Sequence, residues 1–102
     1  MSKILESELE QKMKHYVEQK GGIYWKFTSP STTGVPDRIC LFKGGHAVFV
    51  EWKRPGRLNG LSAKQKIIRD ILVRLGFTVL VVDDAEVFKD CIDLLMRHWN
   101  EV

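Results

Sequence analysis

Hydrophobic residues recur at every third or fourth position in three parts of the chain, which is the spacing that one face of an α-helix requires. This pattern predicts helices over residues 3–20, over residues 62–75 and in a last segment that begins near Asp83 or Asp84. A glycine directly follows each of the first two segments, and glycine commonly ends a helix. The second helix carries the cleanest apolar stripe, formed by Ile67, Ile68, Ile71, Leu72 and Leu75.

Four shorter segments are rich in β-branched and aromatic residues and are separated by glycine, proline or serine, as strands usually are. They are Ile23–Thr28, Asp37–Phe42, Ala47–Lys53 and Phe77–Val82. The last is apolar apart from Thr78, which is typical of a buried strand. The order helix, three strands, helix, strand, helix predicts an α/β fold with one mixed β-sheet flanked by helices. Because the chain has 102 residues and no linker or repeat, we expect a single domain over residues 1–102.

With 44% hydrophobic and 28% charged residues, the chain has the composition of an ordinary globular protein. No apolar run approaches the roughly 20 residues that a membrane-spanning helix needs, and the first residues are charged rather than signal-like. These features predict a cytoplasmic protein that has no membrane partner. In a reducing compartment Cys40 and Cys91, which lie in apolar patterns, are expected to be free, buried thiols.

The net charge of +3 is distributed unevenly along the chain. Residues 36–74 contain nine Lys or Arg against three Asp or Glu, whereas residues 75–102 contain two against six. A localised basic region fits a polyanionic partner such as a nucleic acid, because phosphate neutralisation supplies most of that affinity. A solvated helix surface is the alternative explanation for the same charges.

The third strand segment ends in charged residues. Successive side chains of a strand point to opposite faces, so Glu51 and Lys53 share one face and Trp52 points to the other. A carboxylate and an ammonium are costly to desolvate, so the two either pair with each other or belong to a site. Asp37 begins the preceding strand, and the hairpin returns it towards Glu51. The sequence therefore predicts two carboxylates and a lysine that converge.

This group suits phosphodiester hydrolysis assisted by a metal ion. Hard cations such as Mg²⁺ bind carboxylate oxygens and water, so Asp37 and Glu51 are candidate ligands, and the backbone carbonyl of Trp52 is a third. A bound cation activates water and stabilises charge on the phosphate. Lys53 would orient the nucleophile or neutralise the developing negative charge.

Hairpin register is a test of this site. Asp37 shares the face of Glu51 only if the turn around Lys43–Gly45 contains an odd number of residues, or if the ladder breaks beside Pro36. A two-residue turn would place Arg38 opposite Glu51 instead. We therefore predict a three-residue turn or a glycine bulge.

Four motifs follow one another along the chain: Gly34-Val35-Pro36-Asp37, then Glu51-Trp52-Lys53, the helix start LSAKQ and the strand FTVLVVDD. In this order they resemble the PD-(D/E)xK nuclease superfamily and, more narrowly, stand-alone viral and bacterial VRR-NUC domains. The resemblance covers essentially the whole chain and implies a restriction-endonuclease-like core, dependence on Mg²⁺ or Mn²⁺, and cleavage of DNA, with Holliday junctions and other branched DNA as targets. It also implies a homodimer and a role in DNA repair, recombination or phage replication in a bacterial host.

Two further site residues are implied by the resemblance. A glutamate of the first helix joins the metal site in the family, and Glu8 is its best match here, with Glu6 and Glu10 as alternatives. Gln65 matches a position close to the active-site lysine. Ser62 and Gln65 also have the spacing of a capping box, so the glutamine serves the helix start, the site, or both.

Basic residues near the site are candidates for phosphate contact. They are Lys26, Arg38, Arg54, Arg57 and Lys64. The sequence thus predicts a metal-dependent DNA endonuclease that is selective for DNA structure. A non-catalytic DNA-binding module and a nuclease subunit of a larger complex are the alternatives.

Overall fold

The computed structural model describes residues 3–100, with side chains from Glu8 to Asn100, and it confirms the predicted α/β fold and element order. At most of the helix and strand ends, the observed bounds differ from the predicted ones by one or two residues, because the hydrogen bonding that defines an element weakens at its ends. The elements are α1 (Lys3–Gln19), β1 (Ile23–Lys26), β2 (Arg38–Phe42), β3 (His46–Trp52), α2 (Ala63–Arg74), β4 (Thr78–Val82) and α3 (Ala85–Asn100). None of the helices within residues 3–100 is long and apolar enough to cross a bilayer.

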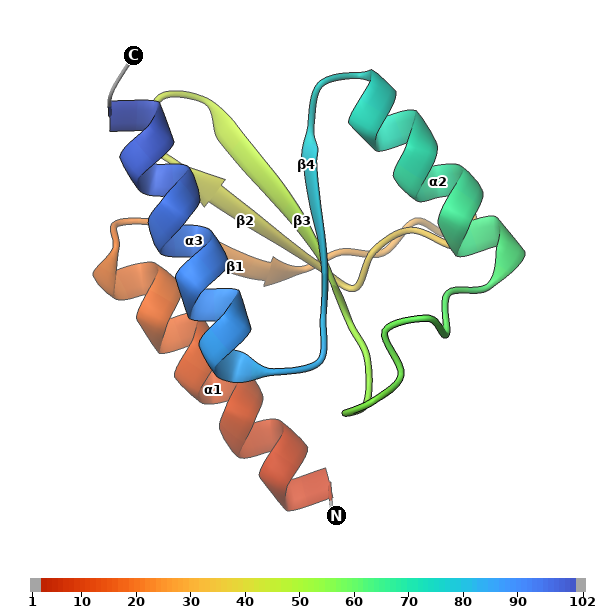
Figure 1. Ribbon diagram of the computed structural model, residues 1–102, viewed down its shortest axis with the longest axis horizontal. Helices are drawn as coiled ribbons and strands as arrows, with labels where there is room; N and C mark the ends of the chain where they lie inside the picture. Colours follow the sequence, from red (N-terminus) through yellow and green to blue (C-terminus); the bar gives the residue numbers. More distant parts are fainter. Residues whose placement is uncertain (1–2, 101–102) are drawn as a thin grey trace.

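The sheet is mixed, with its strands in the order β1-β2-β3-β4. The first three strands pair antiparallel, and β4 joins β3 in parallel. A parallel pair needs a crossover connection, and α2 lies in that connection. The helices α1 and α3 lie side by side along the sheet, whereas α2 lies apart from them and packs against β4 (Figure 1).

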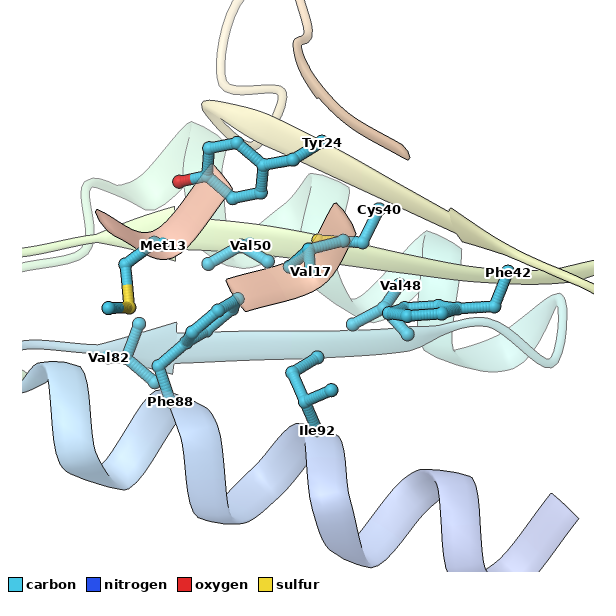
Figure 2. Close-up of a cluster of buried hydrophobic side chains, with 10 residues drawn as sticks. All are labelled: Met13, Val17, Tyr24, Cys40, Phe42, Val48, Val50, Val82, Phe88 and Ile92. Atoms are coloured by element: carbon cyan, nitrogen blue, oxygen red, sulfur yellow. The ribbon is translucent and has the colours of Figure 1, made fainter. Parts of the chain in front are cut away.

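The main hydrophobic core lies between one face of the sheet and the helices α1 and α3 (Figure 2). Alternate strand residues such as Val48 and Val50 point into it and are fully buried. Met13 enters the core from α1, and Phe88 and Ile92 enter it from α3. The burial of these residues fixes which face of each strand is turned towards the two helices, and this assignment also decides where the charged residues of β3 point.

Trp52 faces this core, as strand alternation predicted. Its ring packs against Phe88 at a centroid distance of 5.3 Å, and its indole Nε1 donates a hydrogen bond of 2.9 Å to the hydroxyl of Tyr24. Glu51 and Lys53, its neighbours in sequence, are therefore turned towards the opposite face of the sheet. Cys40 is a buried free thiol as expected, and Cys91 is free but only half-buried.

The turn between β2 and β3 confirms the predicted odd register. Phe42 pairs with His46, which leaves the three-residue turn Lys43–Gly45. Gly44 and Gly45 have φ angles of +93° and +78°, a region that residues with a Cβ rarely adopt. The two glycines are therefore what allows a three-residue turn at this point.

The second face of the sheet is only partly covered, so part of the α2 stripe is exposed and the expectation of a buried fourth strand is wrong. An apolar stripe on a helix normally faces a core, yet Ile67, Ile71 and Leu75 on α2 are 57%, 42% and 69% exposed. The segment Phe77–Val82 was expected to be a buried strand, but of the residues in β4 only Val82 is buried. The reason is the strand order: β4 is an edge strand, and a helix that packs on an edge can bury only a narrow part of its surface.

Replacing Phe88 with alanine should lower the free energy of unfolding by about 3–5 kcal/mol, because the substitution leaves a cavity among fully buried side chains. Urea unfolding followed by circular dichroism measures this change. Val87→Ala is the matched control, since Val87 is the preceding residue of the same helix and is 47% exposed; it should change stability by less than about 0.5 kcal/mol. Equal effects of the two substitutions would contradict this description of the core.

Candidate active site

Asp37 and Glu51 lie opposite each other at one end of the sheet. The ladder between β2 and β3 ends with Arg38 paired to Val50, and its continuation by one residue on each strand sets Asp37 against Glu51. Both side chains then belong to the face that is turned away from α1 and α3. The register that the site requires is thus present.

The carboxylate of Asp37 is held by the backbone of β3. Its Oδ2 accepts a hydrogen bond of 3.1 Å from the Trp52 amide, while the Asp37 carbonyl accepts one of 2.8 Å from the Phe27 amide. Pro36, which precedes it, has no amide hydrogen and cannot continue the ladder. The side chain of Asp37 therefore satisfies an amide at the point where strand pairing stops, and this fixes its position.

Glu51, Lys53 and Gln65 form one hydrogen-bonded network. Gln65 Nε2 donates to Glu51 Oε2 over 2.7 Å, and Lys53 Nζ lies 3.1 Å from Gln65 Oε1 and 3.4 Å from Glu51 Oε2. Gln65 also completes the capping box of α2, because its Oε1 accepts from the Ser62 amide over 2.9 Å. Both interpretations of Gln65 that the sequence left open are therefore realised together: it begins the helix and it contacts the charged pair.

The environment of Glu51 disfavours its negative charge. The residue is 5% exposed, and burial is the largest cause of a raised pKa; the neighbouring carboxylate of Asp37 raises the pKa further, and Lys53 lowers it only in part. Its Oε1 atom is buried and finds no hydrogen-bond partner among the described residues. A buried oxygen of this kind carries a free-energy cost that a ligand with positive charge would relieve.

These residues fit a divalent cation. An unpartnered buried carboxylate oxygen beside a second carboxylate is a donor set of hard oxygens, and Mg²⁺ commonly uses one or two carboxylates and completes its shell with water and phosphate oxygens. No group of three or more His, Cys, Asp or Glu side chains with metal-binding geometry occurs among the residues whose side chains are described. The protein would thus provide two carboxylates, and further ligands would come from water, substrate or backbone.

The structure does not bring Glu8 into this group. Glu8 is an exposed residue of α1, and Glu6 lies outside the residues whose side chains are described. Glu10 is turned towards the sheet and forms an ion pair with Arg38, with 2.8 Å between Glu10 Oε2 and each of two guanidinium nitrogens. The carboxylate of Glu10, the alternative among the first-helix glutamates, is therefore bound to Arg38 and makes no recorded contact with Asp37 or Glu51.

The candidate phosphate-binding residues fall into two groups. Lys26, Arg38 and Arg54 line a cavity between α1 and the end of the sheet at which β3 terminates. Arg57 and Lys64 are exposed, in the loop after β3 and at the start of α2. Sequence reasoning missed the pairing of Arg38 with Glu10, because the two residues are 28 positions apart and nothing in the local pattern relates them.

Comparison with known proteins agrees with the fold and with a nuclease family. No protein-family model matches the chain. The chain is 36% identical over 86 residues to "Putative nuclease p44" of Acyrthosiphon pisum secondary endosymbiont phage 1, an alignment that covers 84% of this chain and 90% of that protein. A solved structure described as a VRR_NUC domain superposes with a TM-score of 0.67 at 21% identity, covering 83% of this chain and 95% of the other.

The raised pKa of Glu51 predicts how stability depends on pH. The folded protein retains a proton on Glu51 at pH values where the unfolded chain, with an ordinary glutamate pKa of 4.5, has released it. In EDTA, wild-type stability should therefore rise relative to Glu51→Gln as the pH falls from the raised pKa towards 4.5. The ratio of the two unfolding equilibrium constants should change by at most about tenfold per pH unit.

Urea unfolding of both proteins at a series of pH values measures this difference. The comparison with Glu51→Gln removes the contribution of all groups that titrate alike in the two proteins. A relative stability that is constant or decreases as the pH is lowered would show that Glu51 is not desolvated as described.

Proposed function

Since the chain belongs to the VRR-NUC nuclease family, we propose that it is a metal-dependent DNA endonuclease and that Asp37, Glu51, Lys53 and Gln65 form its active site. One observation carries the proposal: a buried carboxylate oxygen of Glu51 has no partner among the described residues and lies beside a second carboxylate and a lysine. A core ion pair between Glu51 and Lys53 would account for Glu51 Oε2 alone. It leaves the unpartnered Oε1 of Glu51 without an explanation.

The proposed chemistry divides the work among these residues. Asp37 and Glu51 would hold Mg²⁺ or Mn²⁺, with the Trp52 carbonyl as a further proposed ligand; when bound, the ion would activate water and stabilise charge on the scissile phosphate. Lys53 Nζ, 3.4 Å from Glu51 Oε2, brings a positive charge to the same point and would neutralise the charge that develops on the phosphate.

Gln65 would position the other groups. Its Nε2 fixes one oxygen of Glu51 and its Oε1 accepts from Lys53, so the carboxylate and the ammonium keep a fixed separation. Since Gln65 is also anchored to Ser62 at the start of α2, the network is tied to a rigid element.

Branched DNA is the proposed substrate, as the family resemblance suggests, and the bacterial cytoplasm the proposed compartment. The phage origin of the 36% identical relative supports a role in phage replication or recombination. A non-catalytic DNA-binding module is disfavoured because both carboxylates and the lysine are present at one place. A nuclease subunit of a larger complex would keep the same site, and the assay below distinguishes it by a lack of activity in the isolated protein.

Lys53→Met and Asp37→Asn should each reduce cleavage of four-way junction DNA by at least about 100-fold in Mg²⁺ or Mn²⁺. Lys53→Met removes the positive charge beside the reacting phosphate, and Asp37→Asn removes a charged ligand of the metal ion. Initial rates on labelled junction, flap, linear duplex and single-stranded DNA measure the effect and identify the preferred substrate. EDTA should abolish cleavage by the wild type.

Lys43→Met is the matched control, because Lys43 is an exposed lysine in the hairpin turn at the other end of β3. It should leave the rate within about twofold of the wild type. Circular dichroism and thermal unfolding verify that each variant is folded. Cleavage that persists in EDTA, or that survives in folded Asp37→Asn, would refute the proposed site.

We further propose that a second copy of the chain covers the exposed apolar residues of α2. Ile67, Ile71 and Leu75 on this helix are 57%, 42% and 69% exposed. Apolar residues gathered on one face of a small protein usually mark an interaction surface. A second copy fits the family resemblance, and a symmetric pair would present two active sites to the strands of a branched DNA.

Ile67→Asp should therefore convert a dimer into a monomer, because a charge at the centre of an apolar interface stays desolvated without a partner. Light scattering after size-exclusion chromatography at micromolar concentrations measures the mass. Leu94→Asp is the control, since Leu94 is similarly exposed, at 58%, but lies on α3. A monomeric wild type, or the same loss of mass with Leu94→Asp, would exclude this interface.

A further inference from the structure

A cavity of about 870 Å³ opens between α1 and the end of the sheet at which β3 terminates. Glu10 and Lys14 line it from α1, Tyr24 and Lys26 from β1, and Arg54 from the loop after β3. Tyr24 and Trp52, which point towards the α1 side of the sheet, also line it. The carboxylates of Asp37 and Glu51 are turned to the other face, so the cavity is not the metal site itself.

The lining of the cavity is predominantly basic. It contains the five basic residues Lys14, Lys26, Arg38, Lys53 and Arg54 against the two acidic residues Glu10 and Asp83. Asp83 Oδ2 accepts from the Gly56 amide over 2.9 Å, and three of the basic residues have acidic partners: Arg38 pairs with Glu10 over 2.8 Å, Lys14 with Glu18 over 3.5 Å and Lys53 with Glu51 over 3.4 Å. Lys26 and Arg54 form no ion pair among the residues whose side chains are described, so their positive charges favour an anionic ligand in the cavity.

The size and the aromatic residues narrow the ligand class further. Cavities of about 300–1,000 Å³ enclose ligands of the size of a nucleotide, and a base-paired helix is too wide to enter one. Proteins that bind single-stranded nucleic acids combine a basic groove, which follows the backbone, with aromatic side chains that contact the bases. This cavity has the basic residues. Its aromatic wall is limited to the exposed parts of Tyr24, which is 5% exposed, and of the half-buried Trp52, so a base would contact these rings in part and would not stack on a free aromatic surface.

We propose that this cavity binds an unpaired segment of the DNA strand next to the site of cleavage. The inference rests on the proposed nuclease function and names the feature of the substrate that the protein recognises. Lys53 links the two places, because it lines the cavity while its Nζ lies 3.4 Å from Glu51 Oε2. A strand held in the cavity passes Arg54 and Lys53 at the end of β3 and so reaches the carboxylates. DNA with a flap, a gap or an opened branch point supplies such unpaired nucleotides, so the cavity should favour these structures over a fully paired junction.

Binding measured without cutting tests the cavity separately from catalysis. Fluorescence anisotropy in EDTA would compare a labelled single-stranded 20-mer with a blunt duplex of the same length. Lys26→Glu should weaken single-strand binding at least about tenfold, because a phosphate contact is lost. For the same reason, the slope of the logarithm of the binding constant against the logarithm of salt concentration should become less steep by at least about one. Its effect on the duplex should be several times smaller. Lys43→Glu, the same charge reversal at an exposed lysine in the distant hairpin turn, should affect both DNAs equally and weakly.

Glu10→Gln gives a second test with the opposite sign. The carboxylate of Glu10 accepts a hydrogen bond from the guanidinium of Arg38. Loss of the negative charge in Glu10→Gln should free Arg38 to bind a phosphate. Single-strand binding should then become at least about threefold tighter, with a smaller effect on the duplex. A change that weakens single-strand binding, or that strengthens both DNAs alike, would contradict the cavity as the binding site.

The outcomes separate this inference from the proposed function. If the wild type cuts DNA in Mg²⁺ but Lys26→Glu binds the single strand as Lys43→Glu does, the cavity is excluded and the nuclease remains. If Lys26→Glu selectively loses single-strand binding while no DNA is cut by the wild type, the cavity is supported and the proposed catalytic function fails.

Discussion

The candidate active site depends on the antiparallel register of β2 and β3. The three-residue turn Lys43–Gly45 sets this register, and two glycines at positive φ make the turn accessible. Because side chains alternate along a strand, a shift by one residue would turn Asp37 towards α1 and leave Glu51 without a second carboxylate. The same shift would also turn the apolar residues of β2 out of the main core. Packing of the core and assembly of the site are therefore fixed by one geometric feature, located at the opposite end of the hairpin from the chemistry.

The sheet divides two roles between its faces. The face covered by α1 and α3 carries the fully buried core and supplies most of the stability of the fold. The other face carries Glu51 in a position that raises its pKa, beneath a helix that has no buried residues of its own. A desolvated carboxylate with an unpartnered oxygen costs stability in the isolated chain, and the core on the first face offsets that cost. This division is typical of a site that is completed by a ligand.

Gln65 joins the local structure of α2 to the charged network. One side-chain oxygen accepts from the Ser62 amide and from Lys53, and the amide nitrogen donates to Glu51. The start of the helix and the separation of the two charges are therefore set by the same residue. The loop that connects β3 to α2 carries basic residues past this point, so the element that fixes the network also brings positive charge to the end of the sheet at which β3 terminates.

The sequence by itself determined the order of the elements, the α/β class and the requirement for an odd turn, because each follows from periodicity and alternation over a few residues. It also predicted that Asp37, Glu51 and Lys53 come together, since strand parity and a short set of motifs relate these positions. The tertiary structure alone decided the exposure of the α2 stripe, the pairing of Arg38 with Glu10 and the basic cavity beside Lys53. These features depend on which strand lies at the sheet edge and on contacts between residues far apart in the chain. Local sequence patterns do not encode such long-range contacts, because the contacts form only when the helices pack on the sheet.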